Sequence, residues 1–135
     1  MIDPFLNIKN YLLTVIPLTD LVGDRIYPAT THLNLPAGYS PVGVGSAVAF
    51  NIRGGGTDYT SIILEPSVQF QSFAATEKFA YDIDRALHDA LQDKKNKFFK
   101  VCRREVLGTL LYTPPPTLWP YVLSFFEFRI SNVEV

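Results

Sequence analysis

Residues 121–130 are the most constraining feature of this sequence, because they form an apolar segment that alternates with a period of two. Such alternation is typical of a β-strand, whose successive side chains point to opposite faces of a sheet. One face would carry Val122, Ser124, Phe126, Phe128 and Ile130, and the other Tyr121, Leu123 and Phe125, followed by Glu127 and Arg129. Both faces therefore carry large apolar groups, although the solvent face of an antiparallel sheet is usually polar.

Two explanations fit the apolar groups on the second face. The loop that contains Trp119 could fold over them, since single exposed apolar residues are common in monomers. Alternatively, another subunit covers them, because contiguous apolar patches usually mark interfaces. The second explanation makes the chain a subunit of an oligomer.

The other periodic segments predict two helices. Asp3 and Pro4 suit the start of the first, and Pro17 is predicted to end it, because the residue before a proline is disfavoured in the α region. Thr76 is predicted to cap the second helix, whose apolar stripe would consist of Phe79, Ile83, Ala86, Leu87, Ala90 and Leu91.

Extended segments and turns account for the rest of the chain. Pro66 is predicted to mark a bulge or an edge position, and an irregularity is expected near Glu105. Strands or extended segments are predicted at 24–28, 47–53, 61–73, 98–112 and 121–130, turns at 19–23 and 54–56, and a long irregular connection at 28–46.

The predicted fold class is α+β: two helices packed on one face of a mainly antiparallel four- to five-stranded sheet. Residues 1–135 have the length of one domain, and the 47% apolar content allows a sizeable core. The net charge of −1 gives no global reason to bind nucleic acid. A single cysteine, no signal-peptide pattern and no long apolar run predict a soluble protein made in the cytoplasm.

The residue types that carry chemistry do not converge in the sequence. His32 and His88 have no partner at ligand spacing, and the single Cys102 cannot complete a zinc set. The glycine-rich segments 43–46 and 54–56 lack the context of a phosphate-binding loop and are predicted to be turns. Four aspartates on the second helix are interpreted as a solvated face: Asp82, Asp84, Asp89 and Asp93. We therefore expect no enzyme activity, no cofactor and no metal.

Half of the twelve basic residues fall between Lys94 and Arg104. They could complement the carboxyl end of the second helix and keep the loop soluble, contact the acidic helix face of a neighbouring subunit, or contact DNA. The candidate interface residues are Arg53, Tyr59, Asp82, Asp89, Lys97, Arg103, Arg104, Tyr121, Leu123 and Phe125.

Three segments resemble the tail-terminator, or tail-completion, proteins of long-tailed bacteriophages, and they follow the family order along the chain. Leu18–Pro28 is similar to the opening of these proteins. Val68–Thr76, with the helix from Phe79 to Leu91, resembles their central strand-to-helix unit. The segment Phe126–Ile130 occupies the place of their last strand. The 28–46 connection and the triple proline 114–116 have no counterpart in the family pattern.

The resemblance implies a structural virion protein at the head-proximal end of the tail. Subunits would form a ring, typically a hexamer, that ends polymerisation of the tail tube. The implied partners are the tail tube protein and a neck or connector protein, with no membrane involved, and DNA would pass through the channel without specific binding. The loop 28–46 and the hairpin from Arg53 to Tyr59 would extend from the subunit to make contacts.

Two other functional classes remain open at this point. One is another tail or neck component, such as a tube subunit, which would stack into open-ended polymers. The other is a monomeric α+β ligand-binding or enzymatic domain, which would need an apolar pocket with convergent polar groups.

Overall fold

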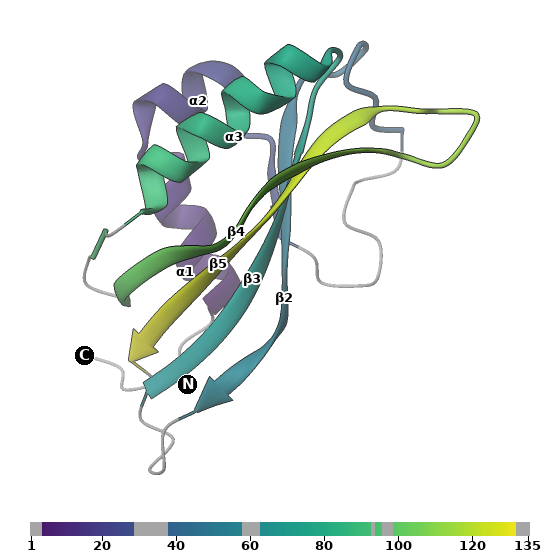
Figure 1. Ribbon diagram of the computed structural model, residues 1–135. Helices are drawn as coiled ribbons and strands as arrows, with labels where there is room; N and C mark the ends of the chain where they lie inside the picture. Colours follow the sequence, from purple (N-terminus) through teal and green to yellow (C-terminus); the bar gives the residue numbers. More distant parts are fainter. Residues whose placement is uncertain (1–3, 29–37, 58–62, 93, 96–98, 132–135) are drawn as a thin grey trace.

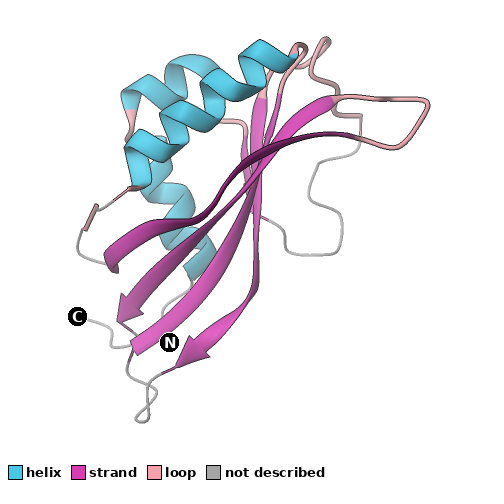
Figure 2. Ribbon diagram, in the orientation of Figure 1, coloured by secondary structure: helices cyan, strands magenta, loops and turns pink. Residues whose placement is uncertain are grey.

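The computed structural model consists of one five-stranded sheet with three helices packed against one face (Figure 1; Figure 2). It describes residues 4–28, 38–57, 63–92, 94–95 and 99–131. The strand order is β1-β2-β3-β5-β4. Only β1 and β2 are parallel, and the other neighbours are antiparallel. The α+β class and the single helical layer are as predicted from the sequence.

Three helices rather than two form this layer: α1 (Pro4–Leu13), α2 (Ile16–Val22) and α3 (Glu77–Leu91). The prediction that residues 19–23 form only a turn was wrong. Val15 adopts an extended conformation between α1 and α2, and Pro17 lies in the first turn of α2. A proline is tolerated there because the first N–H groups of a helix need no partner within it.

The strands are β1 (Ile26–Pro28), β2 (Ala47–Thr57), β3 (Ile63–Phe73), β4 (Phe99–Tyr112) and β5 (Pro120–Ser131). The glycine triplet 54–56, predicted to be a turn, lies within β2 and pairs with β3. The register shifts between Ile52 and Gly54, and Gly55 lies opposite Pro66. An extra residue in one strand is a β-bulge, next to which glycine is well tolerated.

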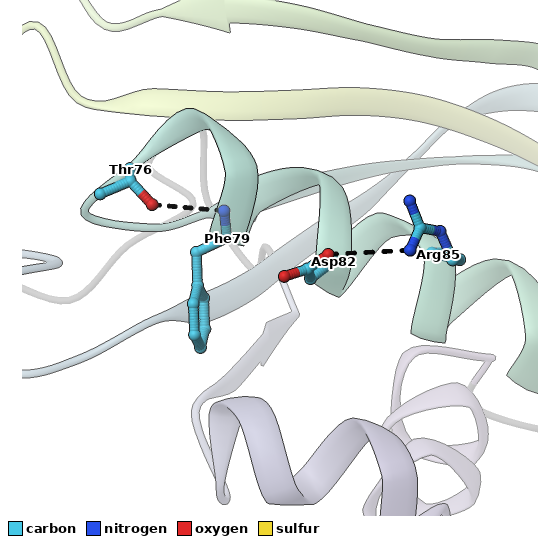
Figure 3. Close-up of polar contacts among 4 residues, drawn as sticks. All are labelled: Thr76, Phe79, Asp82 and Arg85. Carbon is cyan, nitrogen blue, oxygen red and sulfur yellow. Dashed lines mark hydrogen bonds and ion pairs between the residues drawn. The ribbon is translucent and has the colours of Figure 1, made fainter.

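Two local predictions are confirmed. The register of β4 shifts between Arg104 and Val106, which places the expected irregularity at Glu105. Thr76 caps α3, because its hydroxyl accepts a hydrogen bond from the Phe79 backbone N–H at 3.3 Å (Figure 3). The Phe79 side chain, however, is 39% exposed and does not belong to the buried stripe. Ala80 occupies that face instead.

Phenylalanines from four strands form the centre of the core beneath the helices. Phe70 on β3 stacks on Phe50 of β2 and meets Phe126 of β5 edge-on, both at 5.5 Å between ring centroids. Phe128 of β5 meets Phe99 of β4 at 5.2 Å. All five rings are fully buried. The residues of α3 that cover this core are Ala80, Ile83, Leu87, Ala90 and Leu91.

Gly108 allows α3 to lie close to β4. A Cβ atom at this position would be 2.7 Å from the Asp84 Oδ2 atom and 2.7 Å from the Val122 Cγ1 atom. Asp84 is only 6% exposed. The sequence interpretation of Asp84 as part of a solvated acidic face was therefore wrong. Position 84 follows Ala80 and precedes Leu87 at the spacing of the buried stripe, so this carboxylate faces the sheet.

We expect the substitution Gly108→Ala to destabilise the protein by about 1–3 kcal/mol, the usual cost of overpacking a filled site. At an unstrained strand position, replacing glycine by alanine would instead stabilise the protein, because alanine lowers the conformational entropy of the unfolded chain. Urea unfolding measures the difference. Thr109→Ala, at the next and exposed residue, is the control and should stay within about 0.5 kcal/mol of the parent. An equally stable Gly108→Ala variant would contradict the close contact.

Candidate interaction surface

The face of the sheet opposite the helices, called the open face here, consists of rows of neighbouring residues across the strands. Ala47, Phe73 and Tyr121 form the first row, at the end where β2 and β5 begin. In the next row Ala49, Gln71 and Leu123 lie side by side, and in the third row Asn51, Gln69 and Phe125. The open face thus changes from apolar and aromatic at one end to mixed in the middle.

The chain itself covers the aromatic end of the open face. Tyr39 is buried there and meets the rings of Tyr27, Phe73 and Trp119 edge-on at 6.1, 6.3 and 5.8 Å. Phe73 also contacts Tyr121, with ring centroids 5.0 Å apart. At this end, coverage by the chain's own loops is therefore the arrangement found. Tyr39 contacts Phe73 directly, and Trp119 contacts Tyr39.

Hydrogen bonds hold residues 38–46 over the sheet. The Tyr39 hydroxyl donates to the Gly45 carbonyl at 2.7 Å, and the Arg25 Nε–H donates to the Ser46 carbonyl at 2.7 Å. Burial raises the pKa of the Tyr39 hydroxyl well above its usual value, so the group stays protonated and keeps donating. Gly45 has φ +119°, a conformation that L side chains rarely adopt. This part of the predicted irregular connection is therefore an ordered cover.

Sequence reasoning did not identify Tyr39 as a functional residue, because it lies in a segment predicted to be irregular. The only signal for Tyr39 in the sequence was its position between Gly38 and Pro41, two residue types that favour turns. Its position above Phe73 depends on long-range packing.

Tyr39 forms a buried cluster, called the Tyr39 cluster here, with Ala47, Ala49 and Phe73, against which Tyr27 and Tyr121 pack. Leu123 and Phe125 lie on the open face outside this cluster, and both are half-buried. Gln71 and Gln69 are their neighbours on β3, and Thr109 pairs with Leu123 on β4. Two large apolar side chains that remain partly accessible among amides and a hydroxyl leave apolar surface that a partner could cover. Of the three predicted interface residues on β5, Tyr121 is the one that the chain's own loops cover.

The charged residues predicted for the interface do not form one cluster among the described residues. Asp82 lies 3.8 Å from Arg85 on the solvent side of α3 (Figure 3), and Asp89 lies 3.4 Å from the His88 Nδ1 atom. Arg103 and Arg104 pair in register with Glu127 and Phe126 of β5. Their side chains and that of Arg53 lie outside the described part of the structure, as do Tyr59 and Lys97 entirely.

A shallow groove of about 190 Å³ runs along α3 and is lined by Tyr81, Asp84, Arg85 and His88. Pockets for small ligands usually measure about 300–1,000 Å³ and are mainly apolar. This groove is smaller and mostly polar, so it gives little support to a ligand-binding function.

Within the described residues, no three or more His, Cys, Asp and Glu side chains gather in a way that could hold a metal ion. None of the described helices combines the length and the apolar composition needed to cross a bilayer. A comparison with known protein families finds no match for this chain, and a comparison with curated proteins finds none either.

Proposed function

We propose that this chain is the subunit of a tail-terminator ring: a structural virion protein that ends polymerisation of a phage tail tube at its head-proximal end. In that role it offers a surface to a neck or connector protein. The proposal rests on the resemblance of three segments to the tail-terminator family and on the form of the open face. A ring subunit needs no catalytic residues, only contacts between copies.

The observation that carries the proposal is the position of Leu123 and Phe125. Both lie on β5 between β3 and β4, on the open face, and neither belongs to the Tyr39 cluster. Full burial of such a side chain contributes roughly 1.5–3 kcal/mol relative to full exposure, and because both are already half-buried, a contact would add only part of this. A neighbouring subunit on the open face would complete that burial, and the half-buried Gln69 and Gln71 would supply hydrogen bonds at its margin.

A closed ring needs two different patches on each subunit, because each copy contacts its neighbours head to tail. In this proposal a second contact forms between two oppositely charged patches of adjacent subunits. One patch consists of the basic residues near β4, and the other is the acidic side of α3, with Asp82 and Asp89. Lys94 and Lys95, directly after α3, are both exposed. Their contacts would be sensitive to salt, whereas contacts of Leu123 and Phe125 would not.

Electron microscopy and sedimentation velocity of the full chain test the proposal. We expect closed rings in the parent protein and no rings in the double variant Leu123→Lys/Phe125→Lys, because two unpaired charges would be placed in the contact. The matched control is Leu13→Lys, at an exposed position of α1, which should still form rings. Circular dichroism verifies that each variant is folded.

Three outcomes would contradict the proposal in different ways. A parent protein that stays monomeric at high concentration removes the ring altogether. Open-ended tubes in place of closed rings indicate a tube subunit, the alternative within tail assembly. Rings that persist in the double variant show that the open face is not the contact.

A further inference from the structure

Three uncharged segments meet at one end of the sheet, called the loop end here: 38–46, 73–76 and 112–120. None contains Asp, Glu, Lys, Arg or His. The strand register brings them together, because Ala47 pairs with Phe73, Phe73 with Tyr121 and Tyr112 with Pro120. The contact between Tyr39 and Trp119, with ring centroids 5.8 Å apart, joins two of the segments.

Apolar side chains project from the loop end into solvent. Val42 is 82% exposed and Leu118 is 54% exposed. Val44 and Tyr112 are exposed as well. Leu118 has φ +48°, a conformation that is uncommon for residues other than glycine and often persists at functional sites. An ordinary loop tip of a monomer would carry polar residues at such positions.

The loop end is ordered before any partner binds. The Thr117 hydroxyl donates to the Pro114 carbonyl at 2.9 Å, and the Trp119 N–H donates to the Thr113 hydroxyl oxygen at 2.8 Å. Ser40 accepts a hydrogen bond from the Gly43 N–H at 2.9 Å. Because these bonds already fix the loops, a contact here would lose little conformational entropy.

Charge is confined to the margin of this surface and is balanced there. Arg25 binds the Ser46 carbonyl, and Glu77 accepts a hydrogen bond from the Tyr112 hydroxyl at 3.0 Å. Their sequence neighbours Asp24 and Lys78 are both exposed, and the charges of these four residues sum to zero. An apolar centre with a polar rim is the usual arrangement of a protein interface.

We propose that the loop end is a self-contact, through which two copies of this chain meet about a twofold axis. In a contact between two identical patches, any net charge on one patch meets the same net charge on the other copy and is repelled by it. A surface without charges at its centre and with a balanced rim avoids this repulsion. A standard interface uses roughly 20–30 residues per side, and the three segments with their rim approach the lower end of that range.

This contact differs from the ring contact of the proposed function and does not depend on it. Leu123 and Phe125 lie further along β5, on the open face, whereas the loop end lies beyond the first row of the sheet. If rings form, the loop end joins two rings and doubles their mass. If rings do not form, it joins two single chains.

Charge-swap variants of the full chain test the self-contact by sedimentation velocity. The parent should show the doubled species, and Val42→Glu/Leu118→Glu should weaken the doubling at least tenfold. The corresponding lysine variant, Val42→Lys/Leu118→Lys, should be equally defective alone. An equimolar mixture of the two should recover the doubling at low salt, because each contact then pairs opposite charges.

Leu6→Glu/Leu13→Glu is the matched control, with two new carboxylates at exposed positions of α1, and it should double like the parent. The recovery in the mixture also requires that both charged variants are folded. The proposal is overturned if the parent shows no doubling up to the highest soluble concentration, if the glutamate variant doubles like the parent, or if the mixture stays defective.

Discussion

Substitution of Phe70 by alanine is expected to lower the free energy of unfolding by about 3–5 kcal/mol, the usual cost of removing a fully buried aromatic side chain. Phe70 contacts Phe50, Phe126 and Phe128, so its loss would leave a cavity bordered by rings from β2 and β5. Rigid strands on both sides limit how far the cavity can collapse. For a domain with a typical stability of about 5–15 kcal/mol, the loss is a large fraction of the total.

Urea unfolding followed by circular dichroism measures this loss. Phe79→Ala is the control, because it removes the same side chain from a site that is 39% exposed. We expect that variant to lose about 1 kcal/mol or less. Similar losses for the two variants would show that Phe70 is not at the centre of the core.

Substitution of Tyr39 by alanine is expected to cost about 3 kcal/mol, because this buried ring covers the aromatic end of the open face. Its removal would expose Phe73 and Tyr121, which it helps to separate from water. Trp119 is the only tryptophan in the chain and lies against Tyr39, so its fluorescence reports the change directly. We expect a red-shifted emission as well as a lower unfolding midpoint.

Tyr39→Phe separates the ring from its hydroxyl. That variant loses only the hydrogen bond to the Gly45 carbonyl, for which about 1 kcal/mol is expected, and its emission should match that of the parent. An unchanged emission in Tyr39→Ala would contradict the coverage of the open face by residues 38–46.

Elements with a strong local signal could be predicted from the sequence. The alternation from Val122 to Phe128 identified the buried side of β5, and Thr76 identified the start of α3. Both signals arise within a few residues, because side-chain period and capping are local properties. The half-buried state of Leu123 and Phe125 also follows from that alternation.

The errors occurred where distant residues decide the structure. Pro17 was predicted to end a helix, yet packing of Leu18 and Val22 in the core favours a new helix that begins around it. The glycine triplet extends β2 because β3 lies alongside and pairs with it. The helical spacing places Asp84 on the buried side of α3, but only Gly108, far away in sequence, leaves space for its carboxylate there. No local pattern contains these long-range contacts.

The strand order has a consequence for biosynthesis. β5 is the last strand along the chain, yet it lies between β3 and β4, and it contributes Phe126 and Phe128 to the core. On the ribosome, β3 can pair with β2, but its other edge and the whole of β4 have no partner until residues 120–131 are made. Pairing over such sequence separations is slow, and nascent chains meanwhile present unpaired strand edges and aromatic rings. We therefore expect the nascent chain to be most prone to aggregation before residues 120–131 are available.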